Sequence, residues 1–145
     1  MGRILVIYFS ATGNTKRMAE LVAEGASKGG KHDVKLAPVQ ELDVAEVDRA
    51  DGFAFGSPDY FTYMAGEMKT FFDRALFHAK AIKGKPFVTF MSHGGGGGGL
   101  ESLDRLGAAV GLVRAEEGVK ALNAPNKEAS RECVGLGERL AAAVR

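Results

Sequence analysis

The sequence predicts an α/β protein, built as a doubly wound sheet of five parallel strands with helices on both faces. Apolar segments of strand length alternate along the chain with segments of helical periodicity, which is the pattern of βαβ units. Residues 4–9 are continuously apolar, as expected of a strand buried on both faces. With 145 residues, of which 46% are hydrophobic and 26% charged, residues 1–145 have the size and composition of a single globular domain.

The first strand and helix follow directly from the N-terminal pattern. The strand at residues 4–9 precedes a segment that places Met18, Leu21 and Val22 on one helical face. A glycine pair at residues 29–30 then predicts the end of this helix.

The next two strands differ in their expected exposure. Residues 33–37 alternate polar and apolar side chains, which is typical of a half-exposed edge strand. Residues 52–56 are short and apolar and predict a third, central strand. A strong helix follows, with an inward stripe at three- and four-residue spacing. The stripe consists of Met68, Phe71, Phe72, Ala75 and Leu76.

The second half of the chain predicts two strands and two helices. The fourth strand occupies residues 87–91, and the fifth lies within residues 112–122, where charged residues and Gly118 interrupt the apolar pattern. One helix follows the glycine run and another begins at the Pro-Asn pair of residues 125–126. Their inward side chains are Leu100, Leu103, Leu106 and Val110 in the first helix, and Ala129, Cys133, Leu136 and Leu140 in the second.

These elements predict where a ligand binds. If the second strand is an edge and the first is central, the strand order is 2-1-3-4-5. Ligands of such sheets bind beyond the carboxyl ends of the strands, where the winding direction reverses. Three loops meet there, at residues 10–15, 57–64 and 92–99, and the last holds six consecutive glycines of the 20 in the chain.

The first of these loops is suited to an anion. Its small and hydroxyl side chains let backbone N–H groups converge, and the following helix adds a partial positive charge. It is not a nucleotide-triphosphate loop or a dinucleotide fingerprint, because it lacks a Gly-Lys-Ser/Thr ending and has one glycine. The alternative is a plain helix N-cap at Asn14 or Thr15 after a polar turn. The candidate residues are Ser10, Ala11, Thr12, Gly13, Asn14 and Thr15.

Residues 6–15, with Ala19 four positions on, resemble the phosphate loop of the flavodoxin family. Residues 56–64, followed by the helix at residues 68–74, resemble the quinone-reductase branch of flavodoxin-like proteins, and residues 92–97 resemble the glycine-rich loop of that branch. The resemblance implies a three-layer sandwich that binds FMN, with the 5′-phosphate in the first loop and the isoalloxazine ring between the other two. It also implies that the flavin carries the chemistry, without a catalytic side chain.

The second loop offers what a flavin ring requires, namely flat apolar contact and polar groups along its edge. Three aromatic side chains lie at a sheet end, where they have no core to fill, although Phe61 could instead pack on the following helix. Asp59 could tune the flavin potential or be a solvated turn residue. The candidate residues are Ser57, Pro58, Asp59, Tyr60, Phe61 and Tyr63.

The glycine run of the third loop needs a physical reason, because each glycine costs roughly 0.5–1 kcal/mol in ordering relative to alanine. A backbone that approaches a planar ligand closely would provide one, and a flexible loop is the alternative. His93 could lie near the ring edge or be an exposed turn residue. The candidate residues are Ser92, His93, Gly94, Gly95 and Gly96.

Departures from the family leave three functions open. The chain has no tryptophan and a net charge of +1, whereas many electron-carrying flavodoxins stack a tryptophan on the flavin and are strongly acidic around it. It also lacks the long insertion and later histidine of the larger quinone reductases. It is therefore a carrier between redox partner proteins, an NAD(P)H-dependent oxidoreductase that reduces a quinone or another small acceptor, or a flavin-free interaction module.

Composition argues against other classes of function. The 19 basic residues nearly balance the 18 acidic ones and form no basic stripe, so we expect no nucleic-acid partner. A single cysteine excludes an intramolecular disulfide and a cysteine-pair zinc site, and the three histidines lack metal-ligand spacing. No apolar run approaches the roughly 20 residues of a membrane span, so we expect a cytoplasmic protein without a membrane partner. A monomer and a homo-oligomer remain open.

Overall fold

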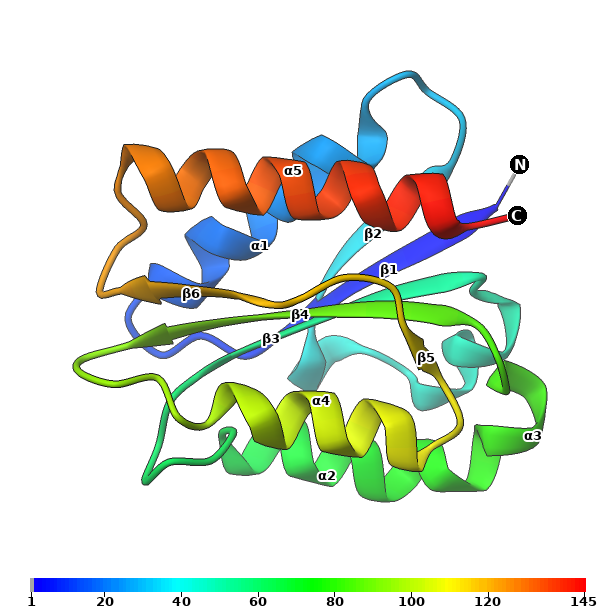
Figure 1. Cartoon of the computed structure of the whole chain (residues 1–145). Coiled ribbons are helices and arrows are strands. Elements are labelled where there is room, and N and C mark those ends of the chain that lie inside the picture. Colours follow the sequence, from blue (N-terminus) through cyan, green and yellow to red (C-terminus); the bar gives the residue numbers. More distant parts are fainter. Residues whose placement is uncertain (1) are drawn as a thin grey trace.

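The computed structural model describes residues 2–145 as a sheet flanked by helices (Figure 1). The strands are β1 (Arg3–Tyr8), β2 (Asp33–Pro38), β3 (Gly52–Pro58), β4 (Pro86–His93), β5 (Val113–Arg114) and β6 (Val119–Leu122). The α-helices are α1 (Asn14–Ser27), α2 (Gly66–Ala75), α3 (Ala79–Ile82), α4 (Leu100–Ala109) and α5 (Lys127–Ala143). Short 3₁₀ turns occur at η1 (Val39–Glu41), η2 (Val44–Arg49) and η3 (Leu76–His78).

The sheet confirms the predicted parallel order. Its strands follow the order β2-β1-β3-β4-β5, and β6 also pairs with β4. The fifth position therefore holds two short strands instead of the single strand that we expected. The chain leaves β4 between them, where Glu116 forms a salt bridge with Arg139 and Gly118 packs tightly against Thr89. The charged residues and glycine that interrupt the sequence pattern thus lie in a real break of the strand.

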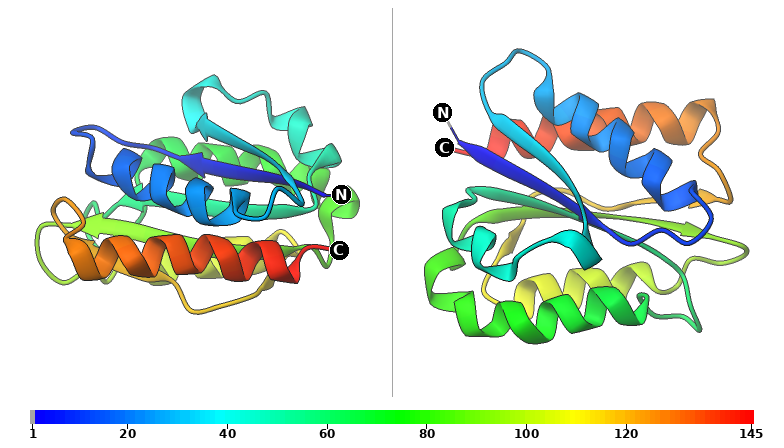
Figure 2. Two further views of the ribbon diagram at one scale, coloured as in Figure 1. Left: turned by 90° about the horizontal axis from the view of Figure 1, so that it is seen from above. Right: turned by 180° about the vertical axis from the view of Figure 1, so that it is seen from behind.

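Two helical layers cover the sheet. Helices α1 and α5 pack on one face, and α2 and α4 pack on the other (Figure 2). Side chains of β1 alternate between the two cores, so Ile4 and Val6 contact the first layer, and Leu5 and Ile7 the second. This double burial explains the continuously apolar sequence of β1. Within residues 2–145, no helix combines the length and apolar character that a membrane span requires.

The helices bury most of the expected side chains. Cys133 and its three partners on α5 are buried, and Asn126 caps this helix by accepting a hydrogen bond from the Ala129 amide at 2.8 Å. On α4, Leu103 is buried, as is Val110 just after the helix, whereas Leu100 and Leu106 are half-buried.

The expected stripe on α2 is wrong at one position. Leu76 is 58% exposed, whereas the four preceding members of the stripe are buried. Helix α2 ends at Ala75 and continues as the tighter turn η3, which changes the angular spacing of the side chains and rotates Leu76 out of the core.

Candidate functional site

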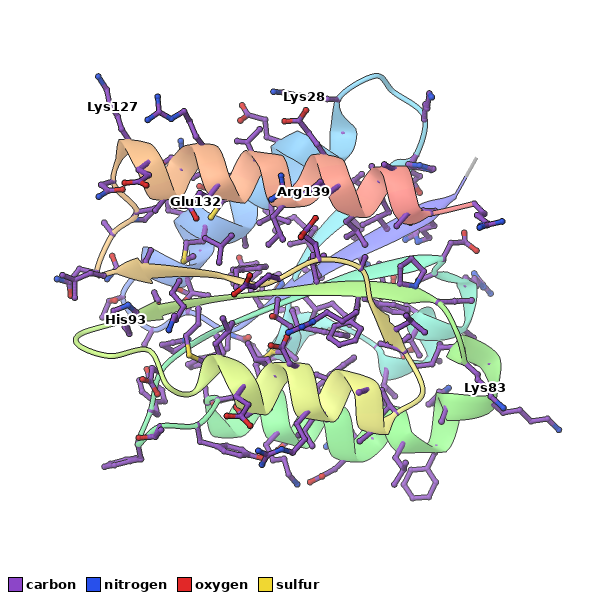
Figure 3. The ribbon with its side chains drawn as sticks, in the orientation of Figure 1. Lys28, Lys83, His93, Lys127, Glu132 and Arg139 are labelled. Carbon is purple, nitrogen blue, oxygen red and sulfur yellow. The ribbon has the colours of Figure 1, made fainter. Side chains whose placement is uncertain are left out.

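The three predicted loops meet at the carboxyl ends of β1, β3 and β4. They enclose a cavity of about 160 Å³. Its lining residues are Ala11, Thr12, Asn14, Thr15, Pro58, Asp59, Tyr60, Ser92, His93, Gly94 and Asn123. In Figure 3, His93 lies at this edge of the sheet, on the same side as Lys127 at the start of α5, whereas Lys83 lies at the opposite edge.

Asn123 is the lining residue that sequence reasoning missed. It follows β6, adopts a left-handed conformation with φ 57°, and donates its backbone N–H to the His93 carbonyl at 2.8 Å. An asparagine after a strand is an ordinary sign of a turn and does not by itself predict a ligand site. Placing Asn123 at the cavity would have required knowing that the fifth strand is broken and that its second part ends beside His93.

The first loop is shaped by Ser10 and Gly13. The Ser10 hydroxyl accepts hydrogen bonds from the Gly13 amide at 3.1 Å and the Lys16 amide at 3.2 Å. Gly13, with φ 99°, is the N-cap of α1 and supplies no side-chain cap. The alternative of an N-cap at Asn14 or Thr15 is therefore wrong, because Ser10 performs the capping from outside the helix.

This arrangement leaves backbone donors free at the start of α1. No acceptor within the described part of the chain takes the amide hydrogens of Ala11, Thr12, Asn14 or Thr15. The first turn of α1 carries no acidic side chain, and Lys16 lies within it. Unpaired N–H groups and the positive end of a 14-residue helix together favour a bound anion.

The second loop forms a tight hairpin after β3. The Asp59 amide donates to the Ser92 carbonyl at 2.9 Å, and the backbones of Tyr60 and Tyr63 exchange hydrogen bonds at 2.9 and 3.0 Å. Between the tyrosines, Phe61 and Thr62 both adopt left-handed conformations, with φ 56° and 63°. Non-glycine residues rarely adopt this conformation, and such strain concentrates at functional sites.

The hairpin separates the predicted aromatic residues. Tyr60 lines the cavity, whereas Tyr63 is exposed and is not part of its lining. Phe61 is fully exposed at the hairpin tip, so the alternative that it packs on α2 is wrong. The left-handed turn directs its side chain away from the protein.

Ser57 supports the second loop from beneath and does not line the cavity. It is fully buried, and its hydroxyl accepts a hydrogen bond from the Ala65 amide at 2.8 Å while donating to the Pro58 carbonyl at 2.8 Å. Both hydrogen-bonding functions are therefore used to hold β3 against the start of α2.

The glycine run divides into two parts. Gly96 and Gly97 have φ of 95° and 67°, and Gly98 and Gly99 lie so close to the hairpin that an added Cβ would be 2.9 Å from Thr62 and 2.7 Å from Asp59. These four glycines are explained by the protein itself. Gly94 and Gly95 have open space around them, so no contact within the described chain requires a glycine at either position.

Two polar atoms in this region lack partners. Asp59 Oδ1 and His93 Nδ1 are the buried side-chain atoms of residues 2–145 that make no hydrogen bond. Both residues are half-buried, and His93 is the last residue of β4, so the alternative of an exposed turn histidine is wrong. Both residues line the cavity, and both also face the glycine run: a Cβ on Gly99 would lie 2.7 Å from Asp59 Oδ1, and a Cβ on Gly97 would lie 2.8 Å from the His93 ring.

Other features of the described chain do not compete with this site. Within residues 2–145, no three His, Cys, Asp or Glu side chains are grouped so that they could hold a metal ion. A larger hollow of about 350 Å³, beside Lys28 and His32, includes no residue of the three loops. The one cysteine, Cys133, is buried on the inner face of α5, and burial raises the pKa of its thiol to about 12, so it is not a ready nucleophile.

Both the sequence and the structure of this chain are similar to those of known proteins. The family model of NADPH-dependent FMN reductases matches residues 3–117. A flavodoxin from Aquifex aeolicus is 48% identical over 102 residues, which cover 70% of this chain and 55% of the relative. A quinone oxidoreductase from Triphysaria versicolor is 34% identical over 122 residues, which cover 69% of this chain and 60% of the relative.

The chain thus spans little more than half the length of these curated relatives. Among solved structures, a flavodoxin from the domain Archaea is similar with a TM-score of 0.88 and 26% identity, over 97% of this chain and 96% of the other.

Proposed function

The chain belongs to the family of NADPH-dependent FMN reductases, and on this premise we propose that it binds FMN and transfers electrons through the bound flavin. The observation that carries the proposal is the set of free amides at the start of α1, on residues that line one cavity together with Tyr60 and His93. FMN supplies the redox chemistry when bound, and the protein supplies binding, orientation and access.

The first loop suits the phosphate end of FMN. Phosphate oxygens are acceptors only, and the amides of Ala11, Thr12, Asn14 and Thr15 are donors without acceptors. The α1 N-terminus stabilises negative charge, and the lining contains no acidic side chain on this flank. Ser10 and Gly13 hold the loop in shape, so they act as positioning residues.

The other two loops suit the flavin ring. Tyr60 provides aromatic surface in the lining, Tyr63 is exposed on the same hairpin, and Gly94 and Gly95 provide backbone without side chains on the other side. The cavity of about 160 Å³ is smaller than most small-molecule pockets, so part of the cofactor would lie on its open rim. A ring on the rim is accessible to an electron donor or acceptor.

Two redox roles follow for the bound flavin. The first is a carrier between redox partner proteins, which needs only an accessible ring edge. The second is an oxidoreductase that takes hydride from NAD(P)H and reduces a quinone or another small acceptor. The second role is favoured by the side-chain-free rim at Gly94 and Gly95, and by a net charge of +1 that does not repel the phosphates of NAD(P)H.

One experiment tests flavin binding and distinguishes these roles. The purified protein is titrated with FMN while its visible spectrum is recorded, and stoichiometric binding with a shifted spectrum is expected. A protein that binds no FMN would be the flavin-free interaction module and would refute the proposal. The FMN complex is then mixed with NADH or NADPH in a stopped-flow instrument. Reduction faster than that of free FMN identifies the oxidoreductase, whereas reduction only by a ferredoxin-type donor identifies the carrier.

A further inference from the structure

Two buried serines hold the end of the hairpin that forms the second loop. The Ala65 amide donates a hydrogen bond to the Ser57 hydroxyl at 2.8 Å, and the preceding amide, of Met64, donates to the Ser102 hydroxyl at 3.0 Å. Ser57 belongs to β3 and Ser102 to the first turn of α4, and they are 0% and 5% exposed. Two successive amides of the hairpin are therefore fixed to two different elements.

Ser102 also holds the glycine run, through the same hydroxyl. Its O–H donates a hydrogen bond to the Gly99 carbonyl at 2.6 Å, while its oxygen accepts the hydrogen bond from Met64. The direction of both bonds is fixed, because a backbone amide can only donate and a backbone carbonyl can only accept. The single hydrogen of this hydroxyl is therefore used by the glycine run, and one of its lone pairs is used by the hairpin.

The Ser102 hydroxyl is the hydrogen-bonded link between the hairpin and the glycine run. Within residues 2–145, no hydrogen bond runs directly from residues 59–64 to the run at residues 94–99. The two segments otherwise meet by close packing, since an added Cβ on Gly99 would lie 2.9 Å from the backbone nitrogen of Tyr63. Packing this tight prevents a closer approach of the two segments, and the bridge through Ser102 resists their separation.

We propose that Ser102 is a positioning residue that sets the spacing between the hairpin and the glycine run, an inference that rests on the proposed function. These two segments are the walls of the proposed flavin-ring site. Ser102 does not line the cavity, so it acts on a ligand only through the two walls. Walls whose spacing is fixed before binding favour a planar ring, because less ordering is then required on binding. The phosphate loop is held separately by Ser10, so the effect of Ser102 is confined to the ring.

Thr89 provides a matched control that contacts the same helix. It is fully buried in β4, and its hydroxyl donates a hydrogen bond at 2.6 Å to Asp104 Oδ1, two residues beyond Ser102 on α4. Thr89→Val removes a buried hydroxyl that joins α4 to the sheet, whereas Ser102→Ala removes one that joins α4 to the two walls. Both substitutions are expected to lower the Tm, but only Ser102→Ala releases the walls.

The test compares both variants with the wild type, with and without flavin. In fluorescence titrations, Ser102→Ala is expected to weaken the binding of FMN and of riboflavin equally, by about threefold to tenfold, because both ligands carry the same ring. Thr89→Val is expected to leave both affinities within about twofold of the wild type. In the flavin-free protein, ¹⁵N relaxation is expected to give lower backbone order parameters at residues 60–63 and 94–97 in Ser102→Ala and unchanged ones in Thr89→Val.

Three results with flavin would overturn this role of Ser102. Unchanged affinities in Ser102→Ala would show that Ser102 does not position the walls. A loss for FMN alone would place its effect at the phosphate, and an equal loss in Thr89→Val would assign the effect to a general loosening of α4.

A wild type that binds neither flavin would instead refute the proposed function. The order parameters of the flavin-free protein would then decide the role of Ser102 alone, and unchanged values in both segments would overturn it. Thermal unfolding checks that each variant folds. If Ser102→Ala does not fold, Ser102→Cys takes its place, with smaller losses expected because its sulfur is a weak donor and acceptor.

Discussion

Replacing Gly13 by alanine tests the phosphate loop directly. Gly13 adopts φ 99° and ψ −11°, and an added Cβ would meet no atom within 4 Å. The substitution is therefore free of steric clash, and its effect comes from a backbone conformation that costs an L-residue roughly 1–2 kcal/mol. Gly13 is exposed, and we expect the loop of the free variant to relax away from this conformation.

The conformational cost then falls on the bound state, which needs converging amides. Gly13→Ala is expected to weaken FMN binding by about fivefold to thirtyfold, the affinity equivalent of roughly 1–2 kcal/mol. Riboflavin, which has no phosphate, is expected to bind with unchanged affinity. Fluorescence titration with both ligands measures the effect, and Gly66→Ala, at an open position without positive φ, is the control. An unchanged FMN affinity, or an equal loss for riboflavin, would refute the phosphate assignment.

Three further predictions concern the ring site, the helical layer and the buried thiol. Replacing Tyr60 and Tyr63 together by alanine should weaken the binding of FMN and of riboflavin alike in fluorescence titrations, because each aromatic contact contributes about 0.5–1.5 kcal/mol beyond burial. Unchanged affinity for both ligands would place the flavin ring elsewhere. Gly137→Ala would bring a Cβ to 2.0 Å from a carbonyl oxygen of α1, so it should lower the free energy of unfolding, measured in urea, by about 2–3 kcal/mol. The control is Gly135→Ala, whose Cβ would meet only an arginine side chain and which should be neutral or stabilising. Burial raises the pKa of the Cys133 thiol from 9.0 to about 12, so as the pH rises the unfolded chain releases this proton before the folded chain does. The free energy of unfolding should therefore be unaffected by this thiol below pH 9. Between pH 9 and pH 12 it should fall by up to about 1.4 kcal/mol per pH unit. Cys133→Ala should remove that part of the alkaline slope, and an unchanged slope would contradict the assignment.

The fold could be predicted because burial leaves strong patterns in the sequence. Residues 4–9 are apolar throughout because side chains of β1 enter both cores, and residues 33–37 alternate because β2 is an edge strand. The strand order then followed from which strand was central and which was at the edge. The split of the fifth strand was visible only as a weak pattern, because strands of two and four residues carry little periodicity.

The site could be predicted at the level of loops but not of individual side chains. Topology brings the carboxyl ends of β1, β3 and β4 together, so the three loops had to meet. The orientation of Phe61 depends on a left-handed turn that no local glycine indicates, and the burial of Ser57 depends on its hydrogen bond to Ala65. The proximity of Thr15 and Ser92 joins residues 77 positions apart, which sequence spacing does not reveal.

The most direct test of FMN binding at these loops is a ¹H–¹⁵N NMR titration of the protein, first with inorganic phosphate and then with FMN. Phosphate is expected to shift the amide signals of residues 11–15 alone. FMN is expected to shift these and also the amides of residues 59–63 and 92–95. Shifts confined to other regions, such as the hollow beside Lys28 and His32, or no shifts with FMN, would contradict the account.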